Sequence, residues 1–224
     1  MTLRLLAWRL GAASLALLAV SVSGALAHPH VFVDARVEVV FDKEGQISAL
    51  RHVWRFDDAF SAFASQGLDA DGDGNLSIDE LKPLAKVNVE SLKDYDYFTY
   101  LKVAGRRIGF KIPTEYWLQS NDGFLTLFYT LPLMQTVKPD ASGVTIDVYD
   151  PGYFVDYQFV EKDPAKLVDA PATCTMEAKR KADPDAATAA ILGQFPASER
   201  ELPANLKAMT SAGDMANRVV VKCP

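Results

Sequence analysis

The most regular pattern in the chain is a two-residue alternation of apolar and polar positions. In a first run, every second position is apolar: Val31, Val33, Ala35, Val37, Val39 and Phe41. In a second run, one face carries Ser48, Leu50, His52, Trp54 and Phe56. Because successive side chains of a strand point to opposite faces, each run predicts a strand with one buried face. The turn sequence at residues 42–45 lies between the runs, so a hairpin is predicted.

Similar alternation returns in short segments separated by turn sequences. We expect strands at residues 95–103, 108–112, 116–119, 124–131, 144–149, 153–160, 174–179 and 218–223, and short helices at 185–192 and 204–209. Many short strands at close spacing are typical of a β-sandwich. The predicted fold is therefore mainly β. It is an antiparallel immunoglobulin-like sandwich over residues 28–160, followed by a small α/β C-terminal extension over residues 161–224.

Residues 57–94 follow a different pattern, which predicts a helix-loop-helix insertion in the sandwich. Apolar side chains occur at near-helical spacing before and after an acidic loop. Pro83 lacks the backbone N–H and clashes one turn back, so it would interrupt a continuous exit helix. We therefore expect a short turn after the loop and a fresh helix that starts near Pro83.

The acidic loop, residues 69–80, has the spacing of an EF-hand calcium site. Calcium takes six to eight oxygen ligands, which such a loop supplies from positions 1, 3, 5, 7, 9 and 12. Those positions are Asp69, Asp71, Asp73, Asn75 (through its carbonyl), Ser77 (through water) and Glu80. Gly74 falls at position six, where the chain needs a positive φ. Because only a single loop is visible, we predict that calcium has a structural role and that the protein is not a calcium sensor. The alternative is an acidic solvated loop that binds no ion.

The first 27 residues have the features of a signal peptide. Arg4 and Arg9 precede an apolar run at residues 10–22, and the small-x-small sequence of residues 25–27 follows. We expect cleavage after Ala27, export to the periplasm and a mature chain that begins at His28; the alternative is an uncleaved anchor. Cleavage removes two positive charges, so the formal net charge of −6 becomes −8. Such an acidic chain is poorly suited to nucleic acid.

The chain contains two cysteines, Cys174 and Cys223. In an oxidising compartment an even pair predicts a disulfide. A loop of about fifty residues closed in this way contributes roughly 4 kcal/mol in the chain-entropy model. A soft-metal site made of two thiols is the alternative.

Two of the three histidines lie at the expected mature N-terminus, in the sequence His28-Pro29-His30. A terminal amine and imidazole nitrogens suit nickel, cobalt, zinc and copper. Pro29 has no N–H, which excludes the square-planar mode that uses its amide. If Phe41 pairs with residue 46, His30 lies opposite Asp57. His28, His30 and Asp57 could then form a transition-metal site. The alternative is that the two histidines are only part of an exposed polar N-terminus and bind no metal. His52 lies between apolar neighbours, which favours a buried core histidine.

Several short segments together resemble a bacterial family. They are residues 28–31 (HPHV), 54–57 (WRFD), the acidic loop leading into 80–81 (EL), 95–99 (YDYFT) and 149–151 (YDP), and the terminal cysteine pair fits as well. The sequence resembles the domain-of-unknown-function family labelled as the periplasmic component of an uncharacterised ABC-type transport system. Its members are often encoded beside nickel/cobalt-type transporters. The resemblance implies a role in divalent-metal handling.

The predicted function is therefore that of a calcium-stabilised periplasmic accessory protein for a nickel, cobalt or zinc transporter of the inner membrane. An enzyme is not expected, since the sequence has no nucleophile elbow, phosphate loop or zinc-protease motif. Two alternatives remain open. One is a copper-dependent oxidative enzyme built on the terminal histidine. The other is a calcium-stabilised interaction module without a second metal.

Overall fold

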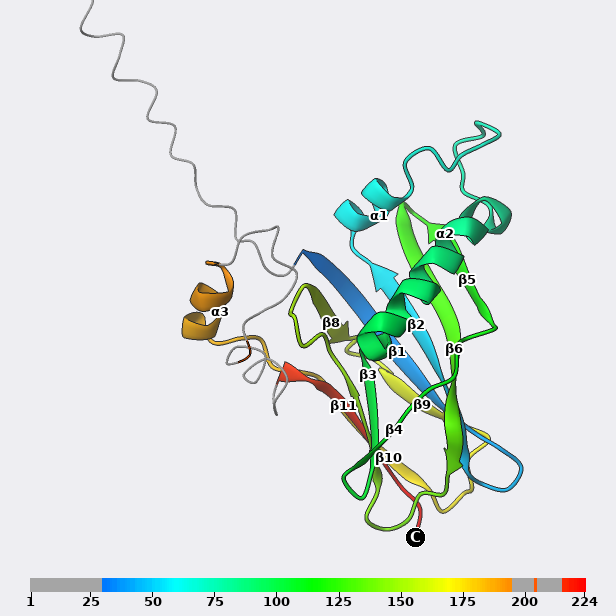
Figure 1. Cartoon of the computed structure of the whole chain (residues 1–224), viewed down its shortest axis with the longest axis vertical. Helices are drawn as coiled ribbons and strands as arrows, with labels where there is room; N and C mark the ends of the chain where they lie inside the picture. Colours follow the sequence, from blue (N-terminus) through cyan, green and yellow to red (C-terminus); the bar gives the residue numbers. More distant parts are fainter. Residues whose placement is uncertain (1–29, 195–203, 205–214) are drawn as a thin grey trace, which may run out of the picture.

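The structure is a computed structural model that describes residues 30–194, residue 204 and residues 215–224. Within these ranges the fold is mainly β, with eleven strands in two sheets and three α-helices (Figure 1). This confirms the predicted mainly β class. Side chains from both sheets pack into one shared core, and the helices and loops are attached to these two sheets.

The first sheet has the strand order β5 (Tyr116–Asn121), β6 (Phe124–Val137), β2 (Ile47–Phe56), β1 (Val31–Phe41) and β8 (Val155–Phe159). The unpredicted strand β9 (Ala165–Val168) also pairs with β1. Both β8 and β9 run parallel to β1, whereas the other neighbours are antiparallel. The prediction of a purely antiparallel fold was therefore wrong at this edge. A parallel neighbour needs a long connection, and the chain between β2 and β8 supplies one.

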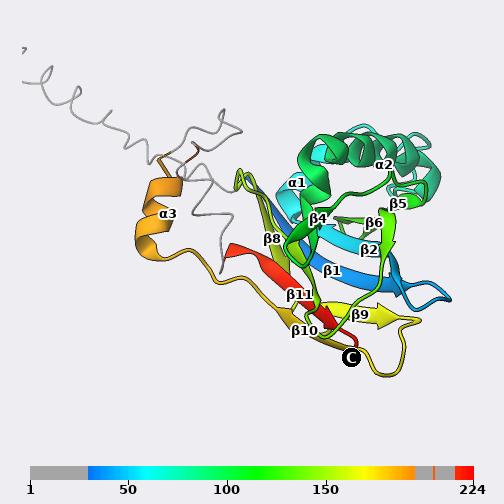
Figure 2. The ribbon, with the colours of Figure 1, turned by 60° about the horizontal axis from the view of Figure 1, so that its bottom comes forward.

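The second sheet is antiparallel throughout. Its order is β10 (Thr175–Lys179), β11 (Asn217–Lys222), β7 (Val144–Val148), β3 (Thr99–Val103) and β4 (Arg106–Ile108). β11 pairs with β7 and β10 pairs with β11, so the C-terminal segments complete this sheet (Figure 2). The helix α3 (Ala186–Leu192) lies on the opposite side of the molecule from the other two helices. The helix predicted at residues 204–209 falls almost wholly outside the described residues.

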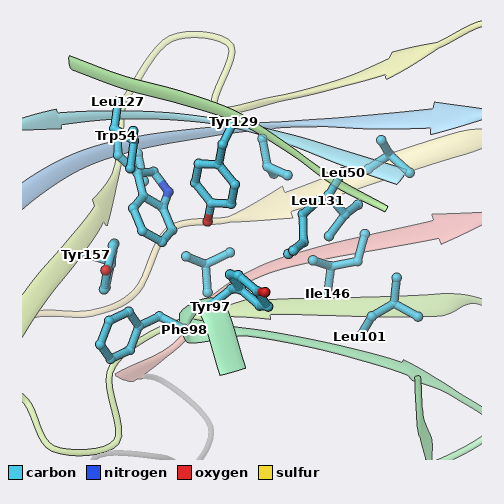
Figure 3. Packing of buried hydrophobic residues seen from close by; sticks show 14 of the residues in the cluster. Leu50, Trp54, Tyr97, Phe98, Leu101, Leu127, Tyr129, Leu131, Ile146 and Tyr157 are labelled. Carbon is cyan, nitrogen blue, oxygen red and sulfur yellow. The ribbon is translucent and has the colours of Figure 1, made fainter. Parts of the chain in front are cut away.

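The core lies between the inward faces of the two sheets. Figure 3 shows Leu50, Trp54 and Tyr129 of the first sheet on one side, and Leu101 and Ile146 of the second sheet on the other. The predicted inward face of β1 is confirmed, because all six of its apolar side chains are buried. Burial of this apolar surface is the main force that holds the sheets together.

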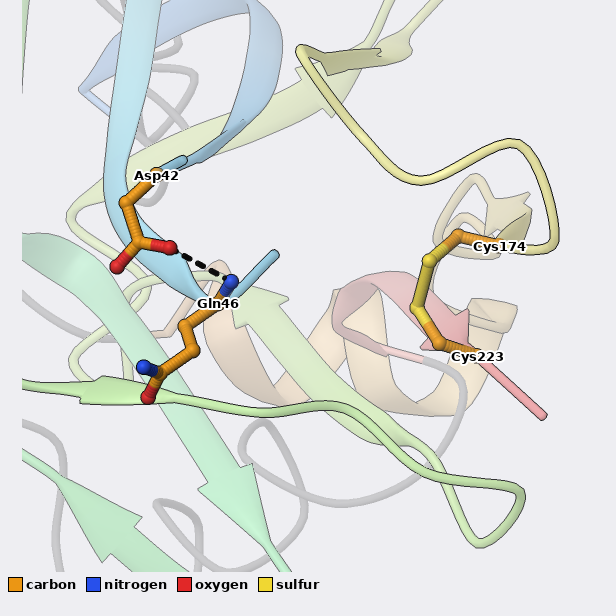
Figure 4. Close-up of a disulfide and its surroundings, with 4 residues drawn as sticks. All are labelled: Asp42, Gln46, Cys174 and Cys223. Atoms are coloured by element: carbon orange, nitrogen blue, oxygen red, sulfur yellow. Dashed lines mark hydrogen bonds between the residues drawn. A yellow bond between two sulfur atoms is a disulfide. The ribbon is translucent and has the colours of Figure 1, made fainter. Parts of the chain in front are cut away.

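The β1–β2 hairpin has a different register from the predicted one. Phe41 pairs with Ile47 rather than residue 46, and a bulge near residue 48 adds one further step, so that Val40 pairs with Ala49. Asp42 fixes the longer turn by accepting a hydrogen bond of 2.8 Å from the Gln46 N–H (Figure 4). From the bulge to its end, β2 is therefore displaced by two residues relative to the predicted pairing.

Two helices and a 3₁₀ segment carry the chain from β2 in the first sheet to β3 in the second. They are α1 (Asp58–Ala64), α2 (Ile78–Leu92) and η1 (Lys93–Phe98). α2 is continuous through Pro83, so the predicted break was wrong. Pro83 lies early in the helix and is exposed, and the buried stripe of Leu81, Ala85 and Val89 packs the helix onto the body. That packing outweighs the single lost hydrogen bond.

Asn217 ties the two sheets together at the start of β11. Its side chain is fully buried and donates to the carbonyls of Val148 (3.2 Å) and Tyr157 (2.7 Å). Its carbonyl oxygen accepts from the N–H groups of Phe159 (2.9 Å) and Lys181 (3.2 Å). One side chain thus satisfies backbone groups of β7, of β8 and of the segment after β10.

Cys174 and Cys223 form a disulfide, as predicted, between residues that are 49 apart in the sequence (Figure 4). It joins the chain just before β10 to the chain just after β11. Disulfides persist mainly in oxidising compartments. Among the described residues, none of the helices is both long and apolar enough to cross a membrane.

Candidate metal sites and an adjoining cavity

The predicted calcium loop, residues 69–80, connects α1 to α2 on the surface. The carboxylate oxygens of Asp69, Asp71 and Asp73 lie within 4.8 Å of one another, and all three side chains are exposed. Over the part of the chain that the structure describes, they form the one group of three or more acidic, histidine or cysteine side chains close enough to share an ion. Three converging carboxylates suit a hard cation such as calcium.

The backbone of the loop winds around Asp69. One oxygen of its carboxylate accepts from the Gly72 N–H at 2.8 Å, and the other accepts from the Gly74 N–H at 3.0 Å. Gly74 has a φ of 83°, as predicted for position six of the loop. A Cβ at this position would meet no atom within 4 Å. The glycine is therefore required by the backbone conformation and not by lack of space.

Glu80 closes the loop by bonding to two separated parts of it. One carboxylate oxygen accepts from the Ala70 N–H at 2.7 Å, and the other accepts from the backbone and hydroxyl of Ser77 at 2.9 and 2.7 Å. These bonds, with the Ser77 backbone contribution largest, lower the pKa of Glu80 from 4.5 to about 2. Ser77 and Glu80 also form the capping box that starts α2. Asn75 lies in the same loop and donates its N–H to Asp73 at 2.6 Å.

The helix that precedes the loop is shorter than the helix that follows it. α1 ends at Ala64, and residues 65–68 form turns before Asp69. Leu76, at position eight, is partly buried and packs against the core. The loop is thus held to the body by an apolar anchor at Leu76 and by the start of α2.

His30 and Asp57 were predicted to lie opposite each other, but the structure does not bring them together. In the observed register, Asp57 lies opposite Phe32, whose N–H donates to its carboxylate at 2.7 Å. The other carboxylate oxygen accepts from the Phe60 N–H at 2.8 Å and caps α1. His30 instead donates its backbone N–H to Phe154, at 2.9 Å, and its ring lies 4.7 Å from the Phe154 ring, centroid to centroid. His28 and the predicted signal peptide lie outside the described residues.

His52 is a core histidine, as predicted. It is 1 % exposed, and its ring stacks on Tyr129 at a centroid distance of 4.9 Å. Its Nε2 lies 3.3 Å from the Thr99 hydroxyl. Desolvation by burial lowers the pKa of His52 from 6.5 to about 3, so the ring is neutral at physiological pH.

An apolar cavity opens between α2, η1 and the start of β8. Its outer part, about 220 Å³ in volume, lies against Ser91, Tyr95 and Asp150. Its inner part, about 160 Å³, reaches Trp54 and Phe60. The two parts share five lining residues: Asn88, Leu92, Phe98, Phe154 and Val155. The shared residues place the two parts next to each other.

Four of the five segments that carry the family resemblance border this cavity. They contribute Val31, then Trp54 and Phe56, then Tyr95 and Phe98, and finally Asp150. These segments are far apart in the sequence and meet at one end of the two sheets. The cavity was not predicted from the sequence, although α2 carries a signal of it. Asn88 is the polar member of a helical stripe that is otherwise apolar: Leu81, Leu84, Ala85, Val89 and Leu92.

The cavity wall includes a strained backbone segment. Asp96, Tyr97 and Phe98 have φ values of 53°, 55° and 47°, and a non-glycine residue in this region costs about 1–3 kcal/mol. The predicted strand at residues 95–103 was therefore wrong at its start, since β3 begins only at Thr99. The left-handed turn places both Tyr97 and Phe98 in the core, and their burial maintains the strain (Figure 3).

The fold and the site define a two-sheet β protein with an acidic surface loop at the start of α2 and an apolar cavity beside the end of that helix. Residues 13–223 match the family model described as "Protein of unknown function (DUF1007)", so the chain belongs to this family. The chain is also similar to the "Uncharacterized 15.5 kDa protein in trpE 3'region" of Spirochaeta aurantia. The two are 30% identical over 100 residues, which are 44% of this chain and 70% of that protein.

Proposed function

We propose that the protein is an exported, periplasmic calcium-binding protein with a single EF-hand-type loop at residues 69–80, set in an immunoglobulin-like sandwich. The observation that carries the proposal is the approach of Asp69, Asp71 and Asp73 to within 4.8 Å at loop positions 1, 3 and 5. Three carboxylates so close together repel one another unless a cation lies between them.

Calcium in this loop has a structural role. The loop lies within the connection between the two sheets, and its last residue, Glu80, is in the first turn of α2. A bound ion holds α1 and α2 in a fixed relation and stabilises this crossing. Ligands that bind only the native state raise stability by mass action.

Calorimetry with calcium tests the loop. Wild type is expected to bind one calcium ion, and Asp71→Asn is expected to weaken binding by about tenfold or more. Asp79→Asn is the matched control, because it removes the same charge from loop position 11, which supplies no ligand. A chelator is expected to lower the melting temperature. The absence of binding heat together with an unchanged melting curve would refute the proposal.

We further propose that the protein is an accessory to a nickel, cobalt or zinc transporter of the inner membrane. The metal is held by the mature amino terminus, His28 and His30. The support is the pair of histidines at the expected mature start and the backbone of His30, which is anchored on Phe154 at the first strand. In the observed register Asp57 lies opposite Phe32 and not opposite His30, so Asp57 is not part of the proposed ligand set.

Titration of the processed protein with nickel, cobalt, zinc and copper tests this site. His28→Ala and His30→Ala are each expected to weaken binding, whereas Asp57→Asn is expected to leave it unchanged. Binding that is insensitive to both histidine substitutions would contradict the proposal. Peroxide production with copper and a reductant would favour an oxidative enzyme instead. His52 lies in the core, stacked on Tyr129, so the described structure does not offer this histidine as a further ligand for copper at the amino terminus.

A further inference from the structure

The cavity beside α2 has an apolar interior and a polar rim. At the inner end, Trp54, Phe60 and Tyr157 present aromatic rings to the space. Near the mouth, the rings of Tyr95 and Phe98 stack at a centroid distance of 5.3 Å. An apolar body therefore fits inside, and a polar group of the same molecule remains at the mouth.

Near the mouth, the polar side chains Asn88 and Ser91 carry acceptor oxygens, whereas the indole N–H of Trp54 at the inner end is a donor. The Asn88 amide uses one N–H to donate to the Leu84 carbonyl at 3.0 Å, so its carbonyl oxygen and its second N–H can still bond to a ligand. The Ser91 hydroxyl donates to the Val87 carbonyl at 2.8 Å, so it has only acceptor capacity left. Neither lysine nor arginine lines the described cavity.

Asp150 adds a carboxylate at the rim. Its two oxygens accept from the N–H groups of Gly152, Phe154 and Val155, at 2.7, 2.9 and 3.0 Å. These bonds fix the carboxylate in position beside the mouth. Because a cation is also attracted to the faces of aromatic rings, the stacked pair Tyr95–Phe98 contributes to the same preference.

We propose that this cavity binds a small molecule with a compact apolar body and a positively charged, hydrogen-bond-donating head, of the alkyl- or arylammonium class. The volumes of about 220 and 160 Å³ place it at the lower end of ligand pockets, with room for one ring and a short chain. The proposal goes beyond the metal-binding function and does not depend on it.

Two probes with the same apolar body and opposite charge test the proposal: phenethylammonium and 3-phenylpropionate. Binding is measured by calorimetry and by the fluorescence of Trp54, which lines the inner cavity. Trp117→Phe removes the exposed tryptophan that stacks on Phe128, so that Trp54 reports without it. Phenethylammonium is expected to bind about tenfold or more tightly than the carboxylate.

Substitutions on α2 assign the binding to the cavity. Leu92→Trp places a larger side chain in the wall shared by its two parts and is expected to weaken phenethylammonium binding by about tenfold or more. Val87→Trp makes a similar change on the exposed side of the same helix and is expected to leave binding within about twofold. Asn88→Leu keeps the volume, removes the acceptor and is expected to reduce the preference for the ammonium probe.

Three results would overturn the inference. They are no measurable binding of phenethylammonium, binding that Leu92→Trp does not weaken, and equal or tighter binding of 3-phenylpropionate. Circular dichroism and the melting temperature of each variant identify any that fail to fold. If Leu92→Trp is unfolded, Leu92→Phe at the same position gives a smaller filling of the cavity, and the two probes still compare head groups in wild type.

Discussion

The buried histidine predicts a specific acid sensitivity of this protein. His52 has a pKa near 6.5 in the unfolded chain and about 3 in the folded protein, because burial disfavours the charged ring. Below about pH 6.5 the unfolded state therefore binds a proton that the native state does not bind. Stability is fully present above the unfolded pKa, falls as the pH drops below it, and stops falling near the folded pKa of about 3.

The size of the effect follows from these two values. Each pH unit between them costs about 1.4 kcal/mol, so lowering the pH from about 7 to about 5 removes roughly 2 kcal/mol of stability. This is a large share of the 5–15 kcal/mol typical of a folded domain. The ring stacks on Tyr129 in the centre of the core, so water cannot reach it without unfolding.

Urea unfolding of wild type and His52→Phe at a series of pH values measures this contribution. The phenyl ring keeps the stacking on Tyr129 but does not titrate. The difference in unfolding free energy between the two proteins is expected to change by roughly 2 kcal/mol between about pH 7 and about pH 5. The carboxylates are common to both proteins and cancel in the difference. A difference that stays constant over this range would refute the reasoning.

Three further substitutions test the framework of the fold. Asn217→Ala leaves two backbone N–H groups and two carbonyls without their partner, which is expected to cost about 3–5 kcal/mol in urea unfolding. An unchanged midpoint would show that water replaces the amide. The double substitution Cys174→Ser and Cys223→Ser opens a loop of 49 residues, and is expected to lower stability by about 4 kcal/mol. Reduction of wild type should reproduce that loss. Asp57→Ala removes the cap of α1 and the bond to Phe32, for an expected loss of about 2 kcal/mol by thermal melting. Asp58→Ala, at the adjacent exposed carboxylate, is the control and should cost less.

The sequence was sufficient to predict the elements that depend on local periodicity. The inward face of β1 and the core position of His52 each follow from residues close together in the chain. Alternation is a local signal, so no knowledge of distant partners was needed. The three loop aspartates were identified in the same way, from their spacing.

The features that depend on distant partners could not be predicted. The longer turn and the bulge near residue 48 together shifted the register by two residues and separated His30 from Asp57, because each extra residue changes every pairing beyond it. The left-handed turn at residues 96–98 opposes local propensity and is maintained by burial of Tyr97 and Phe98. The cavity combines residues of α1, α2, β1, β2 and β8, and only the folded chain brings them together.

The helix α2 connects the proposed calcium loop to the cavity. Glu80 ends the loop within the first turn of α2, and Leu92 forms the cavity wall at the other end of the same helix. Phe60 belongs to α1, the helix that precedes the loop in the sequence, and it lines the inner cavity. Calcium that holds α1 and α2 together therefore also fixes the positions of Phe60 and Leu92 relative to each other.

We expect calcium to raise the affinity for phenethylammonium, because a fixed wall loses less freedom when a ligand binds. Thermodynamic linkage requires the probe to raise the affinity for calcium by the same factor. Calorimetry in both orders measures the two factors, and Asp71→Asn separates calcium binding from probe binding. Equal probe affinity with the loop saturated and with the loop empty would show that α2 does not transmit the effect, even though each site binds its own ligand.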